Sequence, residues 1–202
     1  MGHMTRARRG LTLIGALLVT LAAAGCVRTE GRAPNAQTDA QRANAAFERI
    51  ADDIEEKEGM ADAPTAHLLA GKVRLGDGTR VSLWVSDPVV FAGVRSRCFY
   101  VDTEAPSGRV LGSSGCGEPT DQVVLDRDGA VLVGSVGNWP SRSVQLEIGG
   151  ASQVYAVTGG YFLVAPPFVG DETSAFTLTL LDDAGLSIGE ATFTGSGAAT
   201  PK

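Results

Sequence analysis

Hydrophobic and polar residues follow three successive patterns along this 202-residue chain. A continuous apolar run, Leu11–Ala24, comes first. Between residues 38 and 58 apolar side chains recur every three or four positions, and from Leu68 onward they alternate with polar ones. The second pattern is that of one face of an α-helix, and the third is that of a half-buried β-strand. The chain is therefore predicted to consist of an apolar leader, one helix and a β-rich body.

The apolar leader has the form of an export signal. Arg6, Arg8 and Arg9 precede it, and it is shorter than the run of about 20 residues that a transmembrane helix needs. A basic head, a short apolar core and small residues at the end are typical of a secretory signal. Residues 1–25 are therefore predicted to be a signal peptide, which would place the remainder of the chain outside the cytoplasm.

A cysteine follows the small residues at the end of this segment. The stretch Leu21-Ala22-Ala23-Ala24-Gly25-Cys26 resembles a bacterial lipobox, in which a cysteine receives diacylglycerol before the signal is removed. Ala23 stands where that motif usually has leucine. The resemblance implies a lipoprotein whose acylated Cys26 binds membrane lipid on the extracytoplasmic face of the cell membrane. The alternative is cleavage by an ordinary signal peptidase after the three alanines, which would leave a soluble secreted protein.

A polar segment without periodicity follows the cysteine, so residues 26–37 are predicted to be a flexible tether. Residues 38–59 are predicted to be an amphipathic helix that begins with a capping box of Thr38 and Gln41. Its apolar stripe comprises Ala43, Ala46, Phe47, Ile50 and Ile54. We expect this stripe to pack on the domain that follows. The alternative is a stalk that binds a partner or a second copy.

Short alternating segments separated by turn residues make up the remainder. Gly76-Asp77-Gly78-Thr79 and Asp126-Arg127-Asp128-Gly129 each join two such segments and predict β-hairpins. Many short strands with frequent turns are typical of sandwiches and barrels. The prediction is a mostly β fold, an antiparallel β-sandwich over residues 67–194 that is preceded by the amphipathic α-helix. Whether it forms one or two β units stays open, and residues 195–202 are predicted to be a disordered tail.

The segment from Asp126 to Phe193 carries a loose set of motifs. Its hairpin is followed by Val144-Gln145-Leu146-Glu147-Ile148, then by Val154-Tyr155-Ala156-Val157, and then by a strand between Gly160 and Pro166. This order resembles a module of actinobacterial exported proteins. The resemblance implies an immunoglobulin-like sandwich and an extracytoplasmic location, and it assigns no catalytic residue.

Charge and cysteine content narrow the function. Without residues 1–25, 14 basic and 23 acidic side chains remain, a net charge of −9. A surface of this sign repels phosphate backbones, so no nucleic acid partner is expected. Cys98 and Cys116 remain beside Cys26, and two such cysteines in an exported protein predict one disulfide bond.

Few residues suit catalysis or metal binding. His67 is the only histidine after the signal, so a mechanism with a histidine base would depend on it. A surface or edge histidine is the simpler interpretation. Acidic pairs occur at Asp126 and Asp128 and at Asp182-Asp183, but aspartates also favour turns, and calcium needs about six to eight oxygen ligands. We predict no catalytic residue, no metal and no cofactor.

Three aromatic residues are candidates for contact with a partner. Trp84 lies on an otherwise polar face of its predicted strand and needs a cover, for which the helix is the candidate. Trp139 lies in a turn and Tyr161 begins a strand, where aromatic side chains can stack on a glycan or anchor a protein. A loop tryptophan can also plug the end of a core.

The sequence therefore favours a lipid-anchored, non-enzymatic interaction module of the bacterial cell envelope, with an envelope protein or glycan as its partner. The export signal, the acidic body and the scarcity of catalytic residue types motivate this prediction. The alternatives are a small cell-envelope hydrolase and a solute-binding lipoprotein.

Overall fold

The computed structural model describes residues 27–32, 38–58, 67–91, 94–171 and 173–202. The predicted signal peptide and Cys26 lie outside these residues. The elements are, in chain order, β1 (Val27–Arg32), α1 (Asp39–Glu58), β2 (His67–Arg74), β3 (Arg80–Ser86), β4 (Val89–Phe91), β5 (Val94–Glu104), β6 (Arg109–Gly117), β7 (Val123–Asp128), β8 (Val131–Ser135), β9 (Ser143–Ile148), β10 (Ala151–Ala156), β11 (Tyr161–Val164), β12 (Ala175–Leu181), β13 (Ser187–Thr194) and β14 (Gly197–Ala199).

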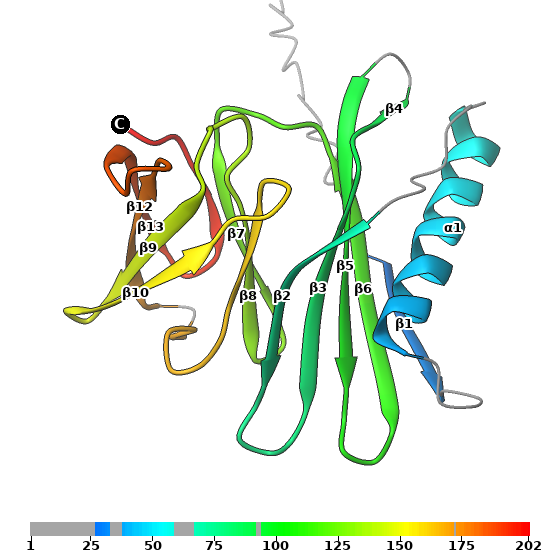
Figure 1. Cartoon of the computed structure of the whole chain (residues 1–202). Helices are drawn as coiled ribbons and strands as arrows, with labels where there is room; N and C mark the ends of the chain where they lie inside the picture. The colour runs from blue at the N-terminus through cyan, green and yellow to red at the C-terminus, as the bar shows by residue number, and fades with distance from the viewer. Residues whose placement is uncertain (1–26, 33–37, 59–66, 92–93, 172) are drawn as a thin grey trace, which may run out of the picture.

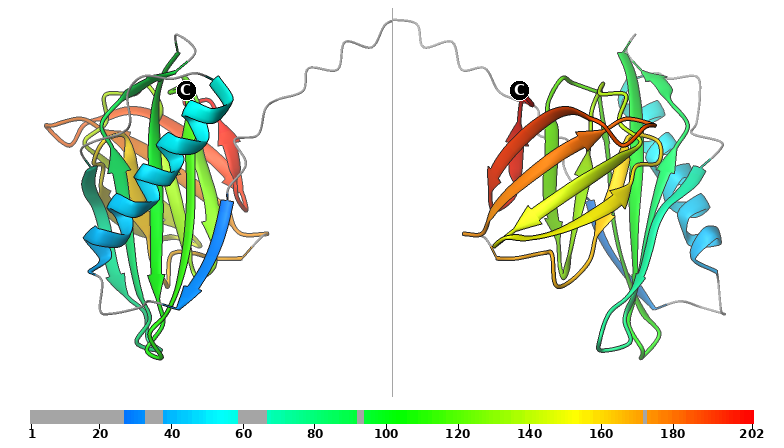
Figure 2. Two further views of the ribbon diagram at one scale, coloured as in Figure 1. Left: turned by 90° about the vertical axis from the view of Figure 1, so that its right-hand side faces the viewer. Right: turned by 60° about the vertical axis from the view of Figure 1, so that its left-hand side comes forward.

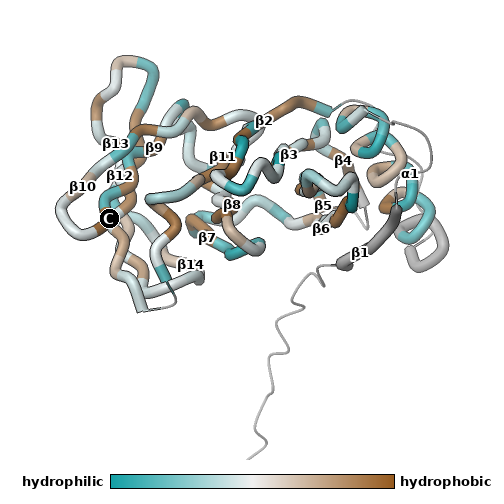
Figure 3. The backbone as a smooth tube through the Cα atoms, turned by 90° about the horizontal axis from the view of Figure 1, so that it is seen from below, coloured by the Kyte–Doolittle hydropathy of each residue, from teal (hydrophilic) through white to brown (hydrophobic). Residues whose placement is uncertain are grey.

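Four layers lie side by side in the molecule (Figure 1). Helix α1 covers one face of the first sheet, whose strand order is β1-β6-β5-β3-β2 with β4 paired to β5. The middle sheet has the order β11-β8-β7-β14, and the outer sheet has the order β10-β9-β12-β13. Figure 2 shows the helix against the first sheet from a second side, and Figure 3 shows the layers from below. The predicted mostly β, antiparallel fold preceded by a helix is confirmed.

Three hydrophobic clusters fill the spaces between the layers. The largest joins the middle sheet to the outer sheet and includes the fully buried Leu132, Leu146, Phe162 and Leu178. The second joins the first sheet to the middle sheet and includes Leu83, Val101, Val133 and Leu163. The third joins α1 to the first sheet and includes Ala43, Phe47, Cys98 and Tyr100. The part of the apolar stripe from Ala43 to Ile50 therefore packs on the β body, as expected.

Strands β8 and β11 of the middle sheet are buried on both faces. Val131 and Val133 pack toward the first sheet, while Leu132 between them packs toward the outer sheet. In β11, Phe162 packs toward the outer sheet and Leu163 packs toward the first sheet. A strand with two buried faces is a continuous apolar run and does not alternate, because both sets of side chains leave water. These short runs explain why the β body has three sheets and not the two of a simple sandwich.

One glycine of the middle sheet makes room for an aromatic ring. Gly134 is paired with Phe162, and a Cβ atom added at Gly134 would lie 1.9 Å from the ring. We expect Gly134→Ala to lower the free energy of unfolding by about 1–3 kcal/mol, because the ring would have to shift within a filled core. The matched control is Gly117→Ala, where an added Cβ atom meets nothing within 4 Å. Urea denaturation of both variants checks the prediction, and equal midpoints would contradict it.

The predicted tether is wrong for part of its length. Val27–Arg32 forms β1 and pairs along its whole length with β6, from Val27 opposite Ser114 to Arg32 opposite Arg109. The sequence of β1 does not alternate, but β6 would otherwise present unpaired backbone groups at the edge of the sheet, and pairing satisfies them. Residues 26 and 33–37 of the predicted tether lie outside the described residues.

The predicted disordered tail is also wrong. Gly197–Ala199 forms β14, which pairs with β7 at the edge of the middle sheet. Beyond it, Glu190 and Lys202 exchange two backbone hydrogen bonds of 3.2 and 2.9 Å. Pro201 between them is buried. Because its backbone groups are paired, this segment belongs to the folded body.

Candidate functional site

Helix α1 is joined to the first sheet by a buried ion pair. Arg42 donates from Nε to Oδ1 of Asp102 at 2.8 Å and from Nη2 to Oδ2 at 2.6 Å. Arg42 is 8% exposed and Asp102 is 2% exposed. A bidentate pair fixes the relative orientation of the two side chains and strengthens the interaction between them. Because both charges are removed from water, loss of either partner would strongly destabilise the fold. The pair therefore holds the helix in one position on the sheet.

The ion pair extends to three neighbouring side chains. Arg42 Nη2 also donates to Oε2 of Glu104 at 2.8 Å, while Arg80 donates to the other oxygen of Glu104. The Tyr100 hydroxyl donates to Oδ1 of Asp102 at 3.2 Å. Burial, followed by the charge of Asp102, raises the pKa of Tyr100 to about 12. Burial acts to raise the pKa of Glu104, but the hydrogen bonds from Arg80 and Arg42 outweigh burial and lower that pKa.

The first turn of the helix makes a second set of polar contacts. The Thr38 N–H donates to Oε1 of Gln41 at 2.9 Å, and the Gln41 N–H donates to Oγ1 of Thr38 at 3.2 Å, which confirms the predicted capping box. Asp39 accepts hydrogen bonds from Lys72 and Ser82 of the first sheet. The Lys72 bond keeps the pKa of Asp39 below its usual value. Both ends of this contact are partly exposed, so it contributes little compared with the buried pair.

The predicted disulfide bond is confirmed. Cys98 on β5 and Cys116 on β6 lie directly opposite each other in the antiparallel register and are covalently joined. Cys98 is fully buried in the cluster beneath α1. The bond therefore lies on the face of the first sheet that the helix covers.

Trp84 lies on this same face and is partly buried against the helix cluster, so its predicted cover is confirmed. The ring of His67 contacts two aromatic rings, with centroids 5.5 Å from Phe47 and 5.6 Å from Trp84. Among the described residues, the Trp84 indole N–H has no hydrogen-bond partner. The surroundings of His67 favour a packing role at the start of the edge strand β2.

Tyr161 lies between the first and middle sheets. Its ring centroid is 5.6 Å from that of Phe99, and it packs against the cluster between these two sheets. Burial raises the pKa of Tyr161 to about 12, while the positive charge of Arg97 acts in the opposite direction. Tyr161 therefore fills an interface between layers.

Trp139 closes one end of the space between the middle and outer sheets. Its indole N–H donates to the backbone oxygen of Asp121 at 3.0 Å, and its ring packs against the largest cluster. A Cβ atom added at Gly189 would lie 3.2 Å from this ring and 3.1 Å from Pro201. Trp139 therefore covers the end of the largest hydrophobic cluster, which is the alternative role considered for a loop tryptophan.

The structure does not bring the three candidate aromatic residues together. Trp84, Tyr161 and Trp139 pack against three different clusters, each at a different interface between layers. Large apolar side chains exposed among the described residues are also dispersed: Leu68, Leu69, Val90, Val124, Val154 and Leu186. Contact of any of these residues with a partner stays a prediction.

Strand β1 begins at mid-length of the first sheet. Val27 begins β1 opposite Ser114, which lies opposite Tyr100 on β5. The short strand β4 pairs with the start of β5, where Val90 lies opposite Arg95, five residues before Tyr100. The pairing therefore places Val27 level with the middle of β5, between the β4 end of the sheet and the β5–β6 hairpin.

No group of three or more histidine, cysteine or acidic side chains is placed to hold a metal ion within the described part of the chain. The single helix in that part of the chain is not long and apolar enough to cross a membrane. No protein-family model matches the sequence, and no curated protein or solved structure matches the chain. The resemblance to an immunoglobulin-like exported module therefore stays a prediction from the residue pattern.

Proposed function

We propose that the protein is a lipid-anchored, extracytoplasmic interaction module of the bacterial cell envelope. The observation that carries this proposal is the bond between Cys98 and Cys116. Structural disulfides persist in oxidising compartments and are rare in the cytosol. In a chain that begins with an export pattern, the bond supports a body that folds outside the cytoplasm.

The third cysteine has a separate role in this proposal. Cys26 follows the small residues of the export pattern and precedes a body with a large negative charge. Acylation of Cys26 would hold this body at a membrane surface that it does not enter. One acyl chain gives only marginal membrane binding, so the two chains of a diacylglycerol provide the stable anchor.

The surroundings of His67 favour an interaction module over the hydrolase alternative. A hydrolase with a histidine base needs this ring beside its nucleophile. The ring is instead in contact with Phe47 and Trp84 under the helix. An envelope protein or glycan is the partner that an anchored, acidic β body would meet at this location.

Replacing the predicted lipidated residue tests the anchor. We expect Cys26→Ala to move the protein from the membrane fraction to the soluble fraction and to abolish incorporation of a labelled fatty acid. Val27→Ala, which changes the adjacent residue and leaves the cysteine, is the matched control and should stay with the membrane. Fractionation after an alkaline wash, with detergent phase partition, makes the measurement. Membrane retention of Cys26→Ala equal to that of the unchanged protein would contradict the proposal.

A further inference from the structure

The outer sheet ends in a strand that lacks the usual protection of a sheet edge. Strand β10 pairs with β9, and no strand among the described residues pairs with its other side. Figure 2 shows β10 along the margin of the outer sheet. Five of its six residues are exposed, and Val154 is 55% exposed. The strand has no charge, no proline and no bulge, which are features that natural edge strands use to prevent pairing with another chain.

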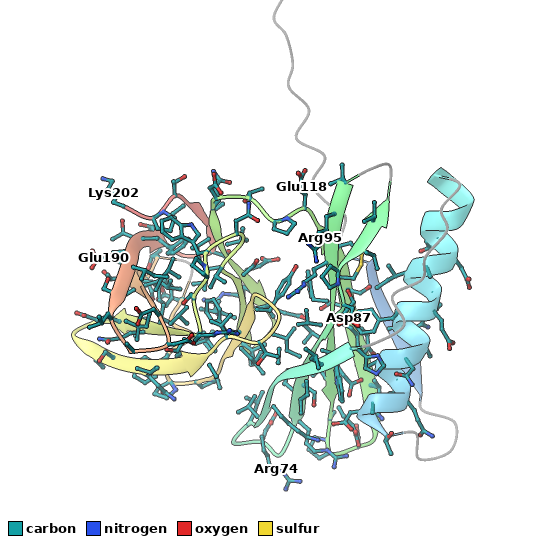
Figure 4. All side chains as sticks on the ribbon, turned by 45° about the horizontal axis from the view of Figure 1, so that its top comes forward. Arg74, Asp87, Arg95, Glu118, Glu190 and Lys202 are labelled. Atoms are coloured by element: carbon teal, nitrogen blue, oxygen red, sulfur yellow. A yellow bond between two sulfur atoms is a disulfide. The ribbon has the colours of Figure 1, made fainter. Side chains whose placement is uncertain are left out.

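The other edges of the three sheets are charged, irregular, short or covered. Strands β1 and β2 of the first sheet carry charged residues, and the register of β2 shifts between Leu69 and Gly71. Strands β11 and β14 of the middle sheet have only four and three residues. The second edge of the outer sheet, β13, is covered where Glu190 and Lys202 exchange backbone hydrogen bonds, and Figure 4 shows both residues at this margin. Within the described part of the chain, β10 is therefore the edge most open to pairing.

The hairpin before β10 decides which of its backbone groups are free. Gly149 and Gly150 both have positive φ and form a two-residue turn. Ile148 and Ala151, which flank this turn, therefore make the first hydrogen-bonded pair of the ladder. Hydrogen-bonded and non-hydrogen-bonded pairs alternate along an antiparallel ladder, so every second residue of β10 directs its N–H and C=O groups away from β9. These residues are Ser152, Val154 and Ala156.

We infer that β10 pairs antiparallel with β10 of a second copy of this chain, so that the two outer sheets join into one. Val154 is the central one of the three free positions. A two-fold axis at Val154 sets Ser152 of each copy opposite Ala156 of the other. Each hydrogen-bonded pair exchanges two bonds, so this register makes about six bonds and uses every free group of both strands. A shift in either direction leaves some of these groups without a partner.

Side chains and charge favour a second copy as the occupant of this edge. In the symmetric register the two exposed Val154 side chains lie opposite each other, and paired β-branched residues stabilise a sheet. Gln153 of each copy lies opposite Tyr155 of the other, so no two charges of the same sign meet across the strands. The acidic bodies repel each other, but at a salt concentration of about 0.15 M this repulsion is screened beyond about 8 Å.

The interface of a single strand pair is small, so the association is expected to be weak and to depend on concentration. It goes beyond the proposed function and does not require the lipid on Cys26. Attachment of both copies to one membrane would raise their effective concentration and favour the pair.

Sedimentation of the full chain with Cys26→Ala at increasing concentration tests the association, and we expect a monomer–dimer equilibrium. Val154→Lys places two like charges opposite each other at the two-fold axis and should weaken dimerisation by about tenfold or more. Leu186→Lys is the matched control, because Leu186 is 65% exposed in the β12–β13 turn of the same sheet. Circular dichroism checks that each variant is folded. A monomer at every concentration, or equal weakening by both substitutions, would overturn the inference.

Oxidative crosslinking identifies the occupant. Val154→Cys and Leu186→Cys are each combined with Cys26→Ala, so that the introduced thiol is the free one. The Cα atoms of a hydrogen-bonded pair are about 5.5 Å apart, a distance that a disulfide spans. Mild oxidation should join Val154→Cys into a product of twice the chain mass, with much less product from Leu186→Cys. Equal crosslinking at both positions, or a crosslink of Val154→Cys to a different protein in cells, would overturn a second copy as the partner and leave the proposed function standing.

Discussion

Arg42→Ala is expected to lower the free energy of unfolding by about 3–5 kcal/mol, the largest effect of any single substitution considered for this protein. The change leaves Asp102, which is 2% exposed, without the cation that pairs with it. A buried carboxylate that loses its partner costs far more than the ion pair adds in net stability. Helix α1 would also lose the contact that fixes its position on the first sheet.

Urea denaturation, followed by far-ultraviolet circular dichroism, measures this loss. Arg142→Ala is the matched control, because Arg142 also pairs with an aspartate, Asp183, but the two side chains are 73% and 82% exposed. An exposed pair contributes about 0–1 kcal/mol, so the control should be close to the unchanged protein. A second variant, Arg42→Met with Asp102→Leu, removes both charges and should recover much of the stability. Similar midpoints for Arg42→Ala and Arg142→Ala would show that the buried pair does not hold the helix.

Removing the disulfide bond should produce the second large effect. The double variant Cys98→Ala, Cys116→Ala is expected to have a free energy of unfolding lower by about 3 kcal/mol. The two cysteines are separated by 18 residues, and this is the value expected for a loop of about that size. The reason in the chain-entropy model is that the crosslink restricts the unfolded chain. Cys98 is also fully buried, so its replacement leaves a small void beneath α1.

The measurement compares thermal or urea midpoints of the double variant with those of the unchanged protein before and after reduction. Reduction alone keeps both sulfur atoms in the protein, so the difference between the reduced protein and the double variant isolates the packing contribution. On reduction, the unchanged protein should lose most of this stability of about 3 kcal/mol. Identical midpoints with and without reductant would contradict a stabilising crosslink.

The local elements of the fold were predictable because their signals are local. The capping box of Thr38 and Gln41 and the period of the helical stripe identify α1. Asp-Gly turns identify the β2–β3 and β7–β8 hairpins, whose strands pair as expected. In each case the residues that decide the conformation are close together in sequence.

The layer order was not predicted, because it depends on which faces meet. The consecutive apolar residues Val131-Leu132-Val133 are the signal for a strand buried on both faces, and this signal was present in the sequence. Strands β1 and β14 carried no such signal. They exist because β6 and β7 offer unpaired edges, a tertiary cause that a polar, non-alternating segment does not reveal.

The buried ion pair was also missed, although the sequence contains a sign of it. Arg42 lies four residues before Ala46 on the apolar stripe, and Asp102 alternates with Tyr100 and Cys98 on the buried face of β5. A charged residue at an inward position needs a buried partner. The identity of that partner, 60 residues away in the chain, comes only from the structure.

Closeness in sequence did not show which candidate aromatic residues lie together in the fold. Trp139 and Tyr161 are close in the chain, but Trp139 packs between the middle and outer sheets and Tyr161 between the middle and first sheets. Adjacent side chains of one strand point to opposite faces, so a shift of one position decides which layer an aromatic ring joins.

The mass of the N-terminal peptide of the mature protein tests the central claim most directly. Protein extracted from membranes with detergent is digested, and the peptide that contains Val27 is measured. The account predicts a chain that begins at Cys26 and carries the mass of a diacylglycerol on that residue. A mature chain with an unmodified amino-terminal residue, recovered from the soluble fraction, would contradict the account.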